Sequence, residues 1–238
     1  MNKIKLFCFP YGGGSSATYY DWKNIVGSYI ELLPIELAGR GKRIAERNYN
    51  SIDDAVEDVF NIVRSDLTNG AYALFGHSLG SMVAFELAYK IMQEKLPLPA
   101  HIFFSGRGAP DAAWHENEKF HLLPEKEFRS EIIKLGGIPR EVFQEEELLD
   151  LVFSLLREDY KIAESYKYNS KEILLPCDIT ILASLDDEAI PEEIEAWKDH
   201  TSRKCDIVYF DGGHFFIKES KDQLIKIVNE KLRFYLTD

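Results

Sequence analysis

The sequence predicts an α/β protein in which a mainly parallel sheet carries helices on both faces. Three observations lead to this fold class. Short apolar runs rich in β-branched and aromatic residues recur along the chain and are typical of strands. Segments with helical spacing separate most of these runs, and such alternation is what a covered parallel sheet requires. The chain has 238 residues, which is enough for one ordinary domain with its own core.

The strands are expected where apolar residues follow one another without a regular polar alternation. Such runs occupy residues 4–9, 29–35, 71–75, 101–105, 179–183 and 207–210. Between the second and third runs, apolar residues from Ile52 to Leu67 fall on one helical face, and Ser51 with Asp54 forms a capping box at its start. Similar helical patterns cover residues 81–93 and 223–236.

The alternation stops between about residues 108 and 170. Two helix-like stretches, residues 125–135 and 145–158, lie in this insertion, and Gly136, Gly137 and Pro139 break them and could form a hinge. The insertion is either a small helical subdomain packed on the sheet or a lid over a site. We favour the lid, because a catalytic motif lies upstream and its partners lie downstream. We therefore expect one domain over residues 1–238 with a helical lid insertion.

Composition excludes several classes of function. Forty acidic against 28 basic residues give a net charge of −12, so nucleic acid is not an expected partner. No run approaches the roughly 18 uncharged apolar residues of a membrane span. The three cysteines form no metal-ligand pattern, and the first residues lack the features of a secretory signal. We expect a cytoplasmic protein without a bound metal.

A Gly-x-Ser-x-Gly motif carries the first chemical signal. Gly76-His77-Ser78-Leu79-Gly80 lies between an apolar strand and a helix, the context in which this motif forms a nucleophile elbow. Glycine at both ends lets the strained turn pass close to the adjoining strand and helix. Ser78 is the expected nucleophile, and the Leu79 N–H at the start of the helix can stabilise an oxyanion.

A serine nucleophile needs a base, and the base needs an acid. His214 follows the last strand and the Gly212-Gly213 turn, so it is the expected base. Asp187 follows the fifth strand and is the expected acid, with Asp186 as its competitor. The order Ser, Asp, His is that of an α/β-hydrolase. The remaining histidines are expected to be solvated or locally hydrogen-bonded: His77, His101, His115, His121 and His200.

The loop after the first strand offers a second oxyanion donor. Its run Tyr11-Gly12-Gly13-Gly14 lets backbone approach a substrate, and we expect the Gly12 N–H in this role ahead of that of Tyr11. A rival interpretation exists. The Gly12-x-Gly14-x-x-Ala17 spacing, with Glu36 after the second strand, matches a relaxed dinucleotide-binding fingerprint. That interpretation leaves the Ser/Asp/His set unexplained.

Several longer motifs resemble type II thioesterases, the stand-alone α/β-hydrolases of nonribosomal peptide and polyketide synthases. The resemblance runs through nearly the whole chain. It rests on FCFPYGGGSS, IELAGRGKR, FGHSLGSMVAFELA, FSGRGAP, LGGIPREVF, LLREDYKIAESY, LDDEAIPEEIEAWKDH and FDGGHFFI. Two positions depart from the family pattern: Ala38 stands where proline is usual, and Ser184 stands where glycine is usual.

The resemblance implies roles for residues already singled out. It assigns Ser78, Asp187 and His214 to the triad and the Gly12 and Leu79 N–H groups to the oxyanion hole. It also implies hydrolysis of aberrant or stalled acyl groups from the phosphopantetheine arm of acyl or peptidyl carrier proteins. The arm belongs to the substrate, so no cofactor of the enzyme itself is expected.

A carrier protein is commonly acidic, as this chain is, so recognition must be local. A basic stretch is expected to contact the carrier or its phosphate: Arg40, Lys42, Arg43 and Arg47.

A product-releasing thioesterase and a general carboxylesterase are alternatives among the hydrolases. A dinucleotide-binding module or a non-catalytic carrier-binding protein is the alternative outside enzymes. Nothing in the sequence indicates an obligate assembly, so we expect a monomer.

Overall fold

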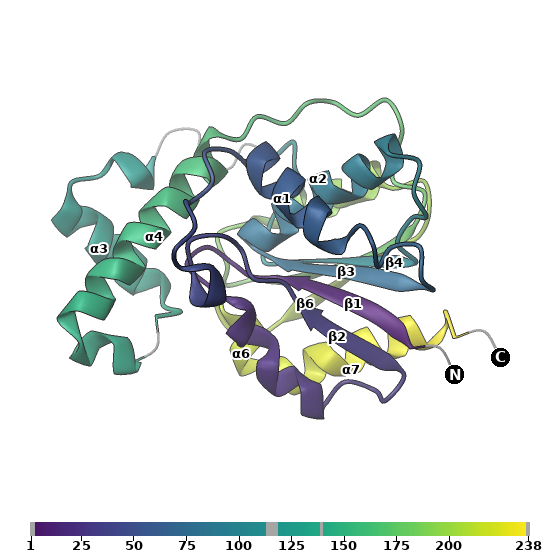
Figure 1. Ribbon diagram of the computed structural model, residues 1–238, viewed down its shortest axis with the longest axis horizontal. Coiled ribbons are helices and arrows are strands. Elements are labelled where there is room, and N and C mark those ends of the chain that lie inside the picture. Colours follow the sequence, from purple (N-terminus) through teal and green to yellow (C-terminus); the bar gives the residue numbers. More distant parts are fainter. Residues whose placement is uncertain (1–2, 113–118, 139, 237–238) are drawn as a thin grey trace.

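A six-stranded, all-parallel sheet forms the centre of the protein (Figure 1). The computed structural model describes residues 3–112, 119–138 and 140–236. The strand order is β2-β1-β3-β4-β5-β6. Each strand lies within two residues of its predicted bounds: β1 Ile4–Phe9, β2 Ile30–Pro34, β3 Tyr72–His77, β4 His101–Ser105, β5 Asp178–Ser184 and β6 Cys205–Phe210.

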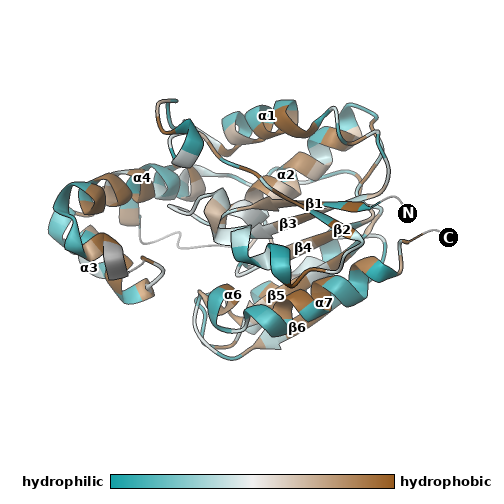
Figure 2. Ribbon diagram, turned by 60° about the horizontal axis from the view of Figure 1, so that its bottom comes forward, coloured by the Kyte–Doolittle hydropathy of each residue, from teal (hydrophilic) through white to brown (hydrophobic). Residues whose placement is uncertain are grey.

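Helices cover both faces of the sheet, as continuous apolar strands require. Helices α1 (Ile52–Val63) and α2 (Leu79–Gln93) pack on one face with Phe7, Phe9 and Leu74. Helix α7 (Lys221–Arg233) packs on the other, where Leu6, Cys8 and Phe75 point. Successive strand residues thus serve opposite cores. Figure 2 shows the apolar residues concentrated in the strands and in α2.

Short elements complete the layers and the loops between them. They are η1 (Ser16–Asn24), η2 (Gly41–Arg43), α5 (Pro191–Glu195), η5 (Ala196–His200) and α6 (Phe216–Glu219). The predicted cap of α1 is present in part, since Ser51 Oγ accepts a hydrogen bond from Asp54 N at 3.1 Å. The Asp54 carboxylate accepts from Asn50 N rather than from Ser51 N. Ser51 Oγ therefore satisfies a backbone donor in the first turn of the helix, and the Asp54 carboxylate satisfies one ahead of the helix.

A helical insertion separates β4 from β5. It consists of η3 (Phe120–Leu122), α3 (Glu125–Leu135), η4 (Arg140–Gln144) and α4 (Glu146–Ser165), and it stands beyond the carboxyl ends of the strands (Figure 1). A small core around Phe128 and Phe153 holds α3 and α4 together. Pro139, one of the residues expected to form a hinge, lies outside the described residues.

Helix α4 extends seven residues beyond the predicted end at residue 158. The sequence pattern misleads there because Asp159 occupies a position on the buried face, between Leu156 and Ile162, where an apolar residue is expected. Its carboxylate is buried by an ion pair rather than exposed. Across the described part of the chain, no helix combines the length and apolar character needed to cross a membrane.

Candidate active site

The turn between β3 and α2 has the strained backbone of a nucleophile elbow. Ser78, at its centre, has φ 53° and ψ −114°, a region that non-glycine residues rarely occupy. The surrounding structure fixes this conformation: Ser78 N donates to Ser105 O at 2.7 Å. Ser81 Oγ lies 2.8 Å from Gly76 O and 3.0 Å from Ser105 O. The turn exposes Ser78 to a cavity while its neighbours are buried.

The two glycines of the motif have no room for a side chain. A Cβ added at Gly76 would lie 2.1 Å from Gly80 O, and one added at Gly80 would lie 2.1 Å from Phe9 O. Both obstacles are backbone atoms, which cannot rotate away as a flexible side chain can. The requirement for glycine expected from the motif is therefore present in the packing.

His214 and Asp187 form a hydrogen-bonded pair beside the elbow. His214 Nδ1 lies 2.9 Å and 3.0 Å from the two carboxylate oxygens of Asp187. Burial raises the pKa of this carboxyl, but hydrogen bonds from His214 and from the Glu188 N–H, together with the neighbouring imidazoles of His214 and His77, outweigh burial, so the pKa is lowered from its ordinary value of 3.8. Asp186, the competing acid, is exposed. The geometry brings Asp187, and not Asp186, to the histidine.

A cavity of about 440 Å³ opens over this pair, and Gly12, Ser78, Leu79 and His214 all line it. The insertion contributes Asp159 and Tyr160 to the wall, and it also makes an apolar part of the wall with Ile132, Leu135, Ile138, Val142, Val152 and Leu156. One end of the cavity therefore holds reactive side chains, and the other can hold an apolar group.

The backbone donors expected to form the oxyanion hole lie at this cavity. Leu79 is the first residue of α2, where an N–H has no intrahelical acceptor. In the glycine loop, Gly13 N donates to Asp159 Oδ2 at 2.7 Å and Gly14 N donates to Tyr11 O at 2.9 Å. Of these three glycines, within the described residues, Gly12 is the one whose N–H is not engaged by a protein acceptor.

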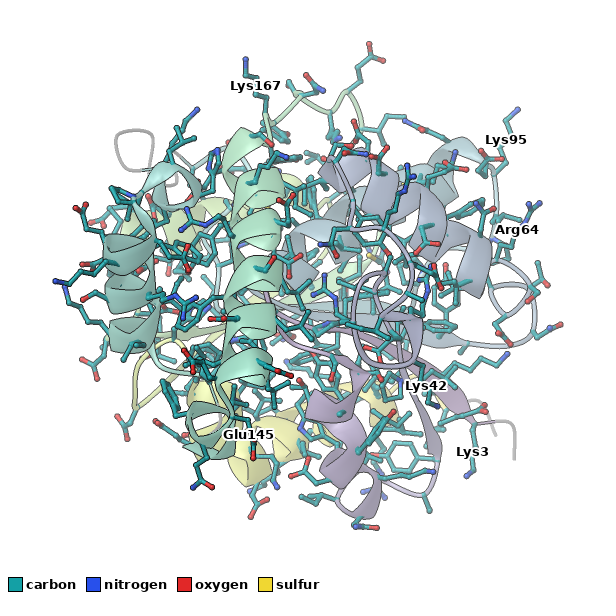
Figure 3. The ribbon with its side chains drawn as sticks, turned by 60° about the vertical axis from the view of Figure 1, so that its left-hand side comes forward. Lys3, Lys42, Arg64, Lys95, Glu145 and Lys167 are labelled. Carbon is teal, nitrogen blue, oxygen red and sulfur yellow. The ribbon has the colours of Figure 1, made fainter. Side chains whose placement is uncertain are left out.

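The basic stretch expected to bind a carrier protein is only partly exposed. The expectation is wrong for Arg40. This residue is 2% exposed and forms a bidentate ion pair with Asp159, with N···O distances of 2.7 Å and 2.8 Å. Glycines at 39 and 41 turn the chain so that the guanidinium points inward. Arg43 pairs with Asp58 and Glu46. Lys42, which Figure 3 labels, and Arg47 are exposed.

Two buried groups near the site have contacts that the sequence did not predict. The Arg40–Asp159 pair fastens α4 to the glycine loop, since Asp159 also accepts from Gly13. The signal in the sequence that could have revealed this pair is Asp159, an acidic residue on the apolar face of a helix. The second group is His77, which is fully buried and hydrogen-bonded to Ser105 and to the backbone of His214. The sequence predicted only that this ring is solvated or locally hydrogen-bonded.

The other histidines whose surroundings the structure describes have local partners. His101 contacts Thr180 at 2.8 Å, His200 contacts Asp111 at 2.8 Å, and His121 pairs with Glu164. These contacts agree with the expectation of local hydrogen bonding. His115 lies outside the described residues.

The acidic residue of the rival dinucleotide-binding interpretation has another use. Both oxygens of the Glu36 carboxylate accept hydrogen bonds from Ser16, one from the backbone N–H at 2.8 Å and one from the hydroxyl at 2.9 Å. Glu36 therefore fixes the start of η1 behind the glycine loop.

The two departures from the family pattern are also accommodated: Ala38 N donates to Tyr49 Oη, and Ser184 Oγ donates to Gly212 O.

Comparison with known proteins agrees with this geometry. The thioesterase domain model matches residues 4–232. The gramicidin S biosynthesis protein GrsT of Aneurinibacillus migulanus is 35% identical, over 98% of this chain and 91% of that protein. The structure of ClbQ from the colibactin NRPS/PKS pathway aligns with a TM-score of 0.93 and 37% identity, covering 98% of both chains. The type II thioesterase BorB from the borrelidin biosynthetic cluster aligns with a TM-score of 0.87 and 32% identity, over 97% of this chain and 93% of that one. The chain belongs to the thioesterase family of α/β-hydrolases, among the type II thioesterases of nonribosomal peptide and polyketide pathways.

Proposed function

We propose that this protein is an editing thioesterase, which removes aberrant or stalled acyl groups from the phosphopantetheine arm of carrier proteins. The observation that carries the proposal is the cavity itself. Ser78 at a strained elbow and His214 paired with Asp187 line one end of it, and apolar residues of the insertion line the other. An acyl thioester has a reactive carbonyl next to an apolar chain, and it fits both ends.

The mechanism follows from the chemistry of these groups. His214 accepts the proton of Ser78 as its hydroxyl attacks the thioester carbonyl, and Asp187 holds the imidazole and stabilises its charged form. The N–H groups of Gly12 and Leu79 donate to the oxyanion. The pantetheine thiolate leaves, takes up the proton from His214, and remains on the carrier. Water, activated by the same imidazole, then attacks the acyl-enzyme and releases the carboxylic acid.

The helical insertion is the proposed lid of a single domain. Its α3–η4 turn touches the loop that carries His214, where Lys218 Nζ donates to Gly137 O at 2.8 Å. A Cβ added at Gly137 would lie 2.1 Å from the Phe215 ring. Opening of this contact would admit the arm from the side of the base. The opposite side of the insertion is fastened by the buried Arg40–Asp159 pair.

Carrier recognition is proposed at the exposed part of the basic stretch. Lys42 and Arg47 are free of the ion pairs that Arg40 and Arg43 make, within the described residues. Reversing both charges (Lys42→Glu with Arg47→Glu) is expected to raise KM for an acyl-carrier protein and to leave hydrolysis of acyl-pantetheine unchanged. Unaltered carrier kinetics would remove this surface from the proposal. The protein is further proposed to act as a monomer in the cytoplasm.

One experiment tests the function. Wild type, Ser78→Ala and the control Ser65→Ala, which changes an exposed serine just after α1, are compared on acyl-carrier protein, acyl-pantetheine and an oxygen ester of the same acid. Preference for the carrier substrate and loss in Ser78→Ala support editing. Equal rates on the oxygen ester indicate a general carboxylesterase. Carrier hydrolysis that appears only when the carrier bears a full-length product chain in place of a short acyl group indicates a product-releasing enzyme. Hydrolysis that survives Ser78→Ala rejects the nucleophile.

A further inference from the structure

One fully buried histidine joins the two halves of the proposed catalytic apparatus. His77 immediately precedes Ser78 at the end of β3. Its Nδ1 lies 2.8 Å from Ser105 Oγ on β4, and its Nε2 lies 3.0 Å from the backbone oxygen of His214, 137 residues away in the sequence. His77 is not among the residues that line the cavity. Its contacts therefore join protein to protein rather than protein to substrate.

The two partners assign the tautomer of the ring. A carbonyl oxygen can only accept, so Nε2 must carry the hydrogen that faces His214 O. Nδ1 of the neutral ring is then an acceptor, and the Ser105 hydroxyl donates to it. Burial, followed by the nearby charge of His214, lowers the pKa of His77 to about 3. The ring therefore keeps one neutral form, with fixed donor and acceptor sides, at ordinary pH.

The position of the loop that carries His214 depends on hydrogen bonds from side chains of the sheet. It follows β6, and its Gly212 has φ 100°, so the chain turns sharply there. The Gly212 oxygen accepts from Ser184 Oγ on β5, and the His214 oxygen accepts from His77 on β3. The His77 and His214 rings lie with centroids 5.1 Å apart. Two side chains from the sheet thus hold the backbone on which the proposed base is mounted.

We propose that His77 is a positioning residue, which fixes the His214 backbone so that the His214 imidazole faces Ser78. The nucleophile and the base then move as one unit, because the residue covalently attached to Ser78 is the one that holds His214. The inference rests on the proposed function only for the roles of Ser78 and His214. It requires no particular acyl substrate.

The test uses two isosteres that separate the two sides of the ring. His77→Gln keeps an N–H near the position of Nε2, whereas His77→Asn keeps a polar group only near Nδ1. The readout is the rate at which a small fluorophosphonate labels Ser78, together with kcat and KM for acyl-pantetheine. Loss of positioning in His77→Asn is expected to lower the labelling rate and kcat on the order of tenfold to hundredfold, with KM unchanged. His77→Gln is expected to remain within about fivefold of wild type.

A matched control separates positioning from stability. His101 is also a buried neutral histidine with a hydroxyl partner on a neighbouring strand, but it lies at the other end of β4. His101→Asn is expected to lower the melting temperature as His77→Asn does and to leave the labelling rate unchanged. In a His214→Ala background, His77→Asn is expected to have no further effect on the residual rate, because the residue acts through His214.

The outcomes divide cleanly. Wild-type labelling in folded His77→Asn, or an equal further loss in the His214→Ala background, overturns the inference. If His77→Asn does not fold, Ser105→Ala replaces it. That variant removes the hydrogen bond that orients the His77 ring from its Nδ1 side, so the labelling rate is expected to fall several-fold, and an unchanged rate overturns the inference. A wild-type protein that labels Ser78 but hydrolyses no acyl thioester contradicts the proposed function and leaves this inference standing.

Discussion

The nucleophile elbow and the helical insertion meet at one cavity, but they are built differently. Strand β3 is buried along its whole length, and eleven of the fifteen residues of α2 are buried. In α3, by contrast, only Phe128 and Ile132 of eleven residues are buried. Large apolar side chains such as Leu148 and Leu151 remain exposed on the adjoining α4. The elbow is part of the central core, whereas the insertion is a thin layer with a small core of its own.

The two regions share a site but are held in place by different contacts. The elbow is held by backbone packing with no spare volume around Gly76 and Gly80. The insertion is attached on one side by the Arg40–Asp159 ion pair and on the other by the contact of Gly137 with Phe215 and Lys218. We expect a side chain added at either glycine of the elbow to abolish folding, and changes in the insertion to have graded effects. The predictions below test that ordering.

The largest effect is expected at the elbow. Gly80→Ala places a Cβ about 2.1 Å from Phe9 O, a clash with backbone that a shift of side chains cannot relieve. Over-packing usually costs about 1–3 kcal/mol, and here we expect loss of the folded protein. Gly70→Ala is the control, because its Cβ meets nothing within 4 Å and only its φ of 96° opposes alanine. Circular dichroism and thermal melting compare the two, and a stably folded Gly80→Ala would refute the packing argument.

The ion pair that fastens the insertion is expected to have the next largest effect. Asp159→Asn leaves Arg40 buried without its charge partner, which typically costs about 3–5 kcal/mol. The loss should be seen in urea unfolding of the whole chain.

A double replacement sharpens this test. Arg40→Met with Asp159→Leu removes both charges and keeps apolar volume, so it should recover much of the stability lost in the single variant. The double variant also lacks the acceptor of the Gly13 N–H, so its thioesterase rate should be lower than that of wild type. Full stability in Asp159→Asn would mean that α4 is not held by this pair.

A smaller effect is expected from pH, through a histidine of the central core. Burial lowers the pKa of His101 from its ordinary value of 6.5 to about 4. As pH falls below 6.5 the unfolded chain takes up a proton that the folded chain does not, so stability is complete above pH 6.5 and is lost progressively toward pH 4. Between pH 7 and pH 5 this histidine accounts for about 2 kcal/mol of the loss. His101→Asn should therefore show a shallower decline in urea unfolding, and an unchanged pH slope would contradict the assignment.

The smallest effect is expected on the outer face of the insertion. Arg129 pairs with Glu125 and Asp150, but all three side chains are substantially exposed and screened by water. Arg129→Gln should change the free energy of unfolding by less than about 1 kcal/mol. The same variant should leave acyl-thioester hydrolysis unaltered. A loss as large as that of Asp159→Asn would show that the insertion depends on its surface charges.

The parts of this protein that depend on local physics could be predicted from the amino-acid sequence. Continuous apolar runs located all six strands, because a parallel sheet covered on both faces needs apolar residues on both. The glycines around Ser78 indicated an elbow, because only glycine tolerates backbone at such short range. The chain order of Ser78, Asp187 and His214 predicted the pairing that the structure contains between the acid and the base.

The burial of particular charged and polar groups could not be predicted from the sequence, because it depends on tertiary contacts. Arg40 in a basic stretch and Asp159 in a charged helix each resemble solvated residues, and their burial follows from meeting each other across 119 positions of sequence. His77 gained its role in the same way, from a loop 137 residues away. The physical reason is that an apolar side chain is driven into the core because its exposure to water is unfavourable. A polar side chain is buried only if a hydrogen-bond or charge partner satisfies it, and that partner is brought to it only by folding.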